Sequence, residues 1–250
     1  MRSFDYIESG KTLLTPHTTS LLAAIHEAKG RQSIQTTIRP DILGTLVAVA
    51  RIQSTDASNR IEGISTSDSR LNDLVSEKVT PRNRNEEEIA GYRDALSVIH
   101  ESHDYIPITP NVILQLHRDL FRHTPLTFAG HFKDSDNVII ERDAHGTSTV
   151  RFAPPSALVT PELIERACSA YTQAIRDGHT DPLLAIAMFI LDFICIHPFN
   201  DGNGRMSRLL TLLMLYRNGY MVGKYISIEH LIEQSKSTYY EALDASTQGW

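Results

Sequence analysis

The chain contains 250 residues, of which 41% are hydrophobic and 22% are charged, as expected for a globular protein with a substantial core. Its formal net charge of −6 excludes a global basic field that could hold nucleic acid. The two cysteines, Cys168 and Cys195, exclude a disulfide framework, and no CxxC pair indicates a zinc site. We therefore expect a reducing, cytoplasmic setting.

The sequence also argues against a membrane protein. No apolar stretch of the signal-peptide type follows Met1. The longest apolar run extends from Leu183 to Ile196, is interrupted by Asp192, and is too short to cross a bilayer. We expect a buried core helix there and no membrane partner.

Helical periodicity covers most of the chain. Proline at a first helical position and glycine after the last turn mark several boundaries. The predicted helices cover 18–28 with Gly30 as the stop, 40–58, 86–100, 110–121, 161–176, 182–196 and 206–218, with a short helix within the polar segment 65–85.

One region instead has β character. The runs Val138–Ile140 and Thr149–Phe152 flank Asp143–Gly146, which predicts a β-hairpin with a glycine-containing turn. The expected fold class is therefore all-α (mainly helical), a helical bundle with one β-hairpin.

A turn follows the apolar core helix. Pro198 prevents that helix from continuing, and Gly202 and Gly204 allow a tight turn before the next helix begins. A helix N-terminus presents unpaired N–H groups and a partial positive charge. Small residues at this point let a phosphate approach the backbone closely, so the turn is a candidate anion site.

Charged residues beside this turn suggest chemistry at phosphorus. Arg205 and Arg208 lie three residues apart and can both donate forked hydrogen bonds to phosphate oxygens. Asp201 would repel a bare phosphate, but Mg2+ between the two would remove the conflict, and Asp201 is also suited to capping the helix. His197 can accept a proton near neutral pH.

The complete stretch from His197 to Arg208 reads HPFNDGNGRMSR, which matches the signature of Fic-domain enzymes at every defined position. The resemblance implies a protein adenylyltransferase, which transfers AMP from ATP to a hydroxyl of a target protein. His197 would deprotonate that hydroxyl, Asp201 would hold Mg2+, and Phe199 would anchor the loop. The remaining phosphate ligands implied by the resemblance are Gly202, Asn203, Gly204, Arg205 and Arg208.

Other parts of the chain resemble the same family. The hairpin, about residues 137–153, corresponds to a flap that aligns the target backbone, with Val138, Ile139 and Ile140 as docking residues. Ala129–Lys133 resembles a conserved segment of the family in which Lys133 replaces the usual arginine. Tyr239 and Tyr240 resemble paired tyrosines near an adenine pocket. The implied organisation is an N-terminal helical region, 1–100, followed by a Fic core, 101–250.

A second motif lies upstream. Ser58–Gly63 fits the family's inhibitory pattern, in which a helix delivers a glutamate to an active-site arginine. Ser58 and Glu62 are four residues apart and share a helix face, while Gly63 can end the helix. Glu62 paired with Arg208 would displace the γ-phosphate, so we expect an autoinhibited enzyme. An ordinary surface helix is the alternative.

Several alternatives remain open at this point. A Fic enzyme could transfer another nucleotide, although kinase-like relatives change the segment that contains Gly204. A nucleotide-sensing regulatory protein without transfer activity would carry the same binding residues. The flap could be a plain surface hairpin, and His117 and His123 lack metal-ligand spacing. The target protein cannot be identified; self-modification is expected, and the resemblance is compatible with de-AMPylation and with a homodimer.

Overall fold

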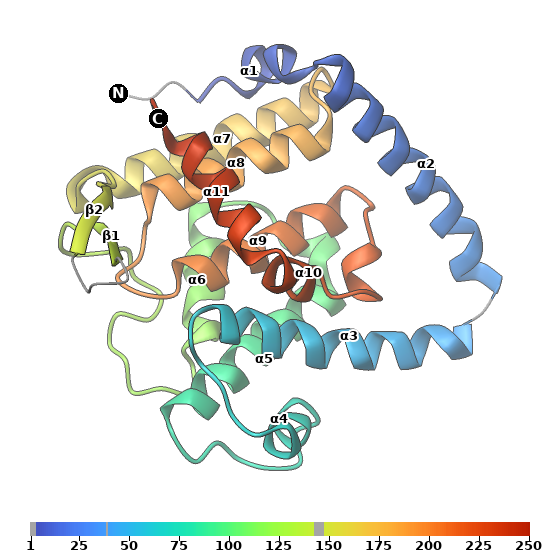
Figure 1. Cartoon of the computed structure of the whole chain (residues 1–250), viewed down its shortest axis with the longest axis vertical. Coiled ribbons are helices and arrows are strands. Elements are labelled where there is room, and N and C mark those ends of the chain that lie inside the picture. Colours follow the sequence, from blue (N-terminus) through green and yellow to red (C-terminus); the bar gives the residue numbers. More distant parts are fainter. Residues whose placement is uncertain (1–3, 39, 143–147) are drawn as a thin grey trace.

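The structure, a computed structural model, describes residues 4–38, 40–142 and 148–250 (Figure 1). Helices dominate these residues, as predicted. The α-helices are α1 (Tyr6–Leu13), α2 (Pro16–Ile38), α3 (Pro40–Ile61), α4 (Asp68–Val75), α5 (Arg84–Ser102), α6 (Pro110–Leu120), α7 (Thr160–Asp177), α8 (Pro182–Ile196), α9 (Asn203–Arg217), α10 (Ile228–Gln234) and α11 (Lys236–Thr247). The 3-10 helices are η1 (His103–Tyr105), η2 (Ala157–Val159) and η3 (Val222–Lys224).

Local signals set several of the helix starts. The Thr109 hydroxyl accepts the N–H of Val112, and Pro110 takes the first position of α6. Asp181 caps α8 in the same way by accepting the N–H of Leu183. Asn83 caps α5. The predicted starts near Pro110, Pro161 and Pro182 are confirmed.

The predicted stop at Gly30 is wrong, because α2 continues through it to Ile38. A glycine inside a helix costs about 1 kcal/mol relative to alanine, which weakens a helix without ending it. Figure 1 shows α2 running along the outside of the molecule from α1 to the start of α3.

The main core surrounds α8. Its side chains Phe189, Phe193 and Ile196 are fully buried among residues of α5, α6, α7 and α9. Asp192 is the one acidic residue in α8, and its carboxylate accepts hydrogen bonds from the Tyr6 hydroxyl and the Trp250 indole. Burial of this polar group is therefore compensated.

The hairpin consists of β1 (Ile139–Arg142) and β2 (Ser148–Phe152), paired antiparallel with an irregularity between Ile139 and Ile140. Both predicted strands are thus present. The predicted turn at 143–146 lies outside the described residues. Among the described helices, none is both long and apolar enough to cross a membrane.

Candidate active site

The site begins where α8 ends. His197 has a left-handed backbone, with φ 49° and ψ 62°, a conformation that non-glycine residues seldom adopt. Its N–H still donates to the carbonyl of Phe193, and Pro198 then turns the chain away from the helix. The Nδ1 atom lies 3.4 Å from the carbonyl oxygen of Ile194. Because only an N–H can donate there, Nδ1 carries the proton and Nε2 is left as the basic nitrogen.

Burial lowers the pKa of His197 below its ordinary value, and the positive charge of Lys133 lowers it further. The Ile194 carbonyl and the carboxylates of Glu62 and Asp201 oppose this shift. The imidazole is therefore neutral at pH 7, which is the form that can accept a proton.

Two residues shape the turn that follows. Gly202 has φ 80°, and a Cβ at this position would lie 2.8 Å from the ring of Phe121. Glycine is therefore required both by backbone angle and by space. The Asn203 side chain pins the turn, because it accepts the N–H of Phe199 and donates to the carbonyl of the same residue. Asn203 thus fixes the loop at the start of α9.

Phe199 is completely buried, as expected for an anchor. Its ring stacks on the imidazole of His117 with a centroid distance of 3.7 Å and an interplanar angle of 1°. His117 receives the Gly130 N–H at Nδ1, so Nε2–H donates to the carbonyl of Asp201, 3.1 Å away. Sequence reasoning assigned His117 no function, yet this residue of α6 fastens the loop.

Asp201 lies at the mouth of the turn, with its side chain 47% exposed. Its Oδ1 accepts the N–H of Gly202 at 2.6 Å, and its Oδ2 is 3.7 Å from the guanidinium of Arg84. Among the described residues, no cluster of three or more His, Cys, Asp or Glu side chains could hold a metal ion by itself. Asp201 therefore offers a single carboxylate.

The two arginines of the motif are paired with different carboxylates. Arg205 is 1% exposed, lies over the ring of Phe121 and forms an ion pair with Glu88 of α5 at 2.7 Å. Arg208 is 4% exposed and forms an ion pair at 2.7 Å with Glu62, the residue that directly follows α3. The partnership of Arg205 with Glu88 was not predicted, because α5 and the motif are far apart in the sequence.

Ser58 completes the contact between α3 and Arg208. Its hydroxyl accepts from Nε of Arg208 at 2.8 Å, and its carbonyl accepts from Nη2 at 2.9 Å. The structure therefore brings Ser58, Glu62 and Arg208 together. Gly63 follows with φ 80°, where α3 has ended, as the pattern predicts.

Because Gly204 has no side chain, it leaves space for the carboxylate of Glu62. A Cβ at Gly204 would lie 2.2 Å from Oε1 of Glu62 and 3.3 Å from Nη1 of Arg208. The carboxylate thus rests against the first turn of α9, where N–H groups and the guanidinium concentrate positive potential. An anion already occupies the site that the sequence assigns to phosphate.

Residues 107–215 match the model of the Fic/DOC family. These residues form a Fic domain. A Fido domain-containing protein of Dictyostelium discoideum is 37% identical over 90 residues, which cover 34% of this chain and 58% of that protein. The protein adenylyltransferase Fic of Nematostella vectensis is 24% identical over 202 residues, covering 77% and 42% of the two chains. The chain therefore spans less than two thirds of either relative.

The fold agrees with this assignment. A Fic domain-containing signalling protein of Bacteroides thetaiotaomicron aligns with a TM-score of 0.72 at 24% identity. The alignment covers 89% of this chain and 80% of that one. The shared fold therefore extends beyond residues 107–215.

An apolar hollow lies beside the end of α8 in the Fic domain. Residues of the hairpin, α8 and α11 surround it: Ile139, Arg151, Phe152, Ile194, Cys195, Tyr240, Leu243, Asp244 and Thr247. An ion pair between Arg151 and Asp244, 2.9 Å long, connects β2 to α11. Tyr240 lines this hollow, whereas Tyr239 packs edge-on against the Tyr240 ring at 5.6 Å. Of the predicted flap residues, Ile139 faces the hollow and Val138 is 52% exposed.

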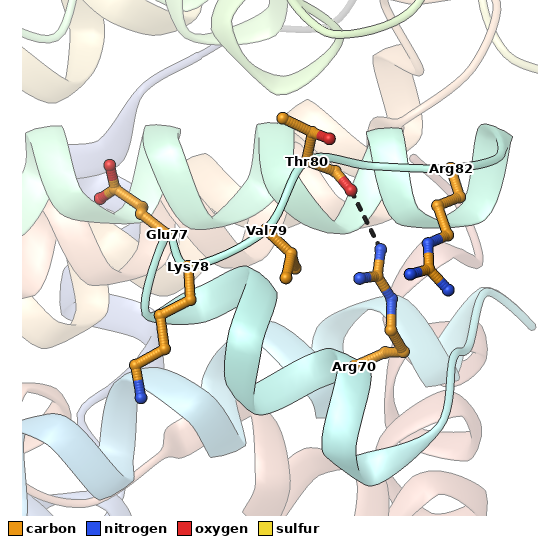
Figure 2. Close-up of a pocket in the computed structure, with 6 residues that line it drawn as sticks. All are labelled: Arg70, Glu77, Lys78, Val79, Thr80 and Arg82. Carbon is orange, nitrogen blue, oxygen red and sulfur yellow. Dashed lines mark hydrogen bonds between the residues drawn. The ribbon is translucent and has the colours of Figure 1, made fainter.

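A second, open hollow lies outside the Fic domain, between α4 and the segment 77–82 that leads to α5 (Figure 2). Basic residues line it, but the guanidinium of Arg70 donates to the carbonyl of Thr80 and to the carboxylate of Glu86. Arg70 therefore fixes the connection between two helices.

Proposed function

We propose that this chain transfers AMP from ATP to a hydroxyl of a protein, itself included, and that Glu62 keeps the activity low. The observation that carries the proposal is the position of the Glu62 carboxylate between Gly204 and Arg208, within the motif that begins at His197. A site that accommodates this anion is suited to phosphate. The name of the Nematostella relative, a protein adenylyltransferase, supports the same reaction.

In this proposal His197 is the general base. Nε2 accepts the proton of the target hydroxyl as that oxygen attacks the α-phosphorus of ATP. The bond between the α-phosphorus and its bridging oxygen breaks, and pyrophosphate leaves. The products are the AMP ester of the target and pyrophosphate, and the proton rests on His197 until solvent removes it.

We propose Mg2+ as the cofactor, held by Asp201. The single exposed carboxylate fits this ion, because Mg2+ in nucleotide sites uses one or two carboxylates together with substrate phosphates and water. When bound, the ion would neutralise negative charge on the phosphates. Arg84 lies near the same carboxylate and would have to share it or withdraw.

The remaining phosphate contacts would come from the start of α9. We propose Gly202, Asn203 and Gly204 as backbone ligands and Arg208 as the cationic ligand, because Gly204 and Arg208 already contact the carboxylate of Glu62. Arg205 is held by Glu88 and is almost completely buried. We propose that Arg205 acts on the phosphates from its buried position, through its positive charge and by stabilising the turn.

The apolar hollow beside Tyr240 is the proposed site for the adenine ring. Ile139 and Tyr240 would contact the two faces of a flat base, since aromatic and aliphatic side chains favour such stacking. The hairpin then has two proposed roles, because Ile139 faces the base while Val138 is exposed toward a target backbone.

Autoinhibition follows from competition for Arg208. With Glu62 in place, the γ-phosphate loses its cationic partner, and ATP can bind only with the α-phosphate displaced from the line of attack. A displacement of about 1 Å can lower the rate about 100-fold. Glu62 keeps 33% of its side chain exposed, so the carboxylate has an open route away from the site.

The test is substitution of Glu62. We expect Glu62→Gly to raise self-modification by AMP about 100-fold, measured by mass spectrometry after incubation with ATP and Mg2+. Glu62→Gln is the matched variant, which keeps the shape and loses the charge that holds Arg208, and it should give an intermediate rise. Equal AMP incorporation in Glu62→Gly and the parent would remove the inhibitory role.

His197→Ala in the Glu62→Gly protein separates an enzyme from a nucleotide-binding regulator. The enzyme should lose about 100-fold or more of its rate, which is typical of a general base, while ATP binding by calorimetry stays the same. ATP binding without AMP transfer in every variant would favour the regulator. Supplying UTP, CTP and GTP in the same assay tests transfer of another nucleotide, and AMP-labelled protein tests the reverse reaction.

A further inference from the structure

The proposed base lies in a stretch of four consecutive backbone carbonyl groups, those of Ile196, His197, Pro198 and Phe199. A helix leaves its last carbonyls without partners inside the helix, and such groups need hydrogen bonds when they are buried. The loop leaves α8 at this point, so its carbonyls have no regular ladder to join. Their partners decide how firmly His197 is held.

Two residues from one short segment reach all four carbonyls, and Asn203 also donates to the carbonyl of Phe199. The ammonium of Lys133 donates to the carbonyl of Ile196 at 3.1 Å, and the N–H of Lys133 donates to that of Pro198 at 2.8 Å. The side-chain amide of Asn137 donates to the carbonyls of His197 at 3.5 Å and Phe199 at 3.3 Å. All four carbonyls are therefore reached from Lys133 and Asn137.

The two side chains also orient each other. Lys133 Nζ donates to Oδ1 of Asn137 at 2.9 Å. An ammonium has no acceptor, so this contact identifies the oxygen of Asn137 and directs the amide NH2 toward the loop. Removing either side chain therefore disturbs both pairs of contacts.

Lys133 is buried, which indicates that its hydrogen bonds are part of the packed interior of the protein. Lys133 is 3% exposed, and burial lowers its pKa to about 8. Burying an ammonium is unfavourable unless donors and charges are compensated. The compensation here is the negative end of α8, where the Ile196 carbonyl lies.

The backbone of His197 gives this arrangement its function. A non-glycine residue at φ 49° stores roughly 1 kcal/mol or more of strain and persists only where its surroundings hold it. Contacts on the carbonyl of His197 itself and on the carbonyls directly before and after it provide that hold. They also keep Nδ1 near the Ile194 carbonyl, and so keep Nε2 toward the reacting atoms.

We propose that Lys133 and Asn137 form a carbonyl bracket that positions His197 for proton transfer, so that both are positioning residues of the reaction. This inference rests on the proposed function. The bracket acts on the geometry of the base: its hydrogen bonds go to the loop carbonyls, and neither of its residues lines the apolar hollow. Its loss should therefore lower turnover and leave nucleotide affinity unchanged.

The experiment compares four substitutions in the Glu62→Gly protein: Asn137→Ala, Lys133→Met, Lys133→Arg and Ser135→Ala. Ser135 lies between the two bracket residues, is exposed, and is the matched control. We measure kcat and KM for ATP in self-modification, ATP affinity by calorimetry, and hydrogen exchange of peptides covering 196–204.

The bracket predicts a fall in kcat of about 10- to 100-fold for Asn137→Ala and Lys133→Met, with KM for ATP within about twofold of the parent. Exchange in 196–204 should become faster in both. Lys133→Arg keeps the cation that donates to the Ile196 carbonyl and should recover most of the rate, and Ser135→Ala should match the parent.

Parent-like kcat and exchange in Asn137→Ala and Lys133→Met would overturn the bracket, as would an equal rise in KM and fall in kcat. If Lys133→Met unfolds, the half-buried Asn137→Ala decides the question. If the Glu62→Gly protein transfers no AMP, the proposed function fails, and the exchange rates still show whether the bracket holds the loop.

Discussion

His197 lies between a buried helix end and an open turn, and this position governs its protonation. Burial and the charge of Lys133 lower its pKa below 6.5, while the carboxylates of Glu62 and Asp201 act in the opposite direction. A base is active when deprotonated, so a lowered pKa extends activity toward acidic pH. The residue is tuned by its neighbours on both sides.

The lowered pKa of His197 predicts how the rate of AMP transfer falls at acidic pH. In the Glu62→Gly protein, the rate of AMP transfer should decline as the pH falls, with a midpoint below pH 6.5. Removal of the Glu62 charge strengthens the effect, because that carboxylate raises the pKa of His197. A profile of kcat against pH checks this, and a midpoint above 6.5 would contradict it.

At the scale of elements, Ser58 lies in helix α3 and Glu62 directly follows it, and α10 and the start of α11 hold the end of α3. Arg60 forms an ion pair with Glu233 of α10 at 2.9 Å, and Nζ of Lys236 at the start of α11 donates to the Ile61 carbonyl at 3.0 Å. Ser54, one helical turn before Ser58, donates to the Ser227 hydroxyl. The position of Glu62 therefore depends on α10 and the start of α11 as well as on Arg208.

Weakening the contact between α3 and α10 should relieve inhibition in part. We expect Glu233→Gln to raise self-modification by AMP about two- to fivefold, because a partly exposed ion pair contributes about 0.5–1 kcal/mol. The measurement is AMP incorporation by mass spectrometry. Glu8→Gln, which removes a comparable pair with Lys11 on α1, is the control and should have no effect.

Local signals explain which elements the sequence could predict. Capping residues and prolines mark the starts of α6, α7 and α8, and the hairpin follows from its β-rich runs. The stop expected at Gly30 failed because a single glycine weakens a helix without ending it. Helix α2 simply continues through this residue.

Part of the candidate site could also be predicted from the sequence, and part could not. The residues from His197 to Arg208 are adjacent in sequence, so their pattern could be recognised. His117, Glu88 and Asn137 act on that loop from distant segments, and nothing in their local sequence indicates it. The first bonds a backbone carbonyl, the second pairs with a buried guanidinium, and both contacts exist only after α5, α6 and α9 have packed.

The whole molecule is joined through buried polar contacts as well as through its apolar core. His100 of α5 is 7% exposed and lies 3.3 Å from the Tyr216 hydroxyl of α9. Burial lowers its pKa from 6.5 to about 4. The folded protein therefore contains neutral His100 at pH values where the unfolded chain has already bound a proton.

This difference links stability to pH. Above pH 6.5, His100 is neutral in both the folded and the unfolded protein and does not lower the free energy of unfolding. As the pH falls from 6.5 toward 4, protonation of the unfolded chain lowers the free energy of unfolding, by about 2 kcal/mol at pH 5. Urea unfolding at pH 7.5 and pH 5 should show a smaller loss for His100→Leu than for the parent. Equal losses in the two proteins would contradict the assignment to His100.

The glycine at position 204 has a genetic consequence. Its missing side chain makes room for the Glu62 carboxylate, and the proposed phosphate cradle uses the same space. A substitution there would expel the inhibitor and the nucleotide together. In a selection for unregulated activity, escape mutations should consequently fall in α3 and in the helix that supports it, while codon 204 stays unchanged.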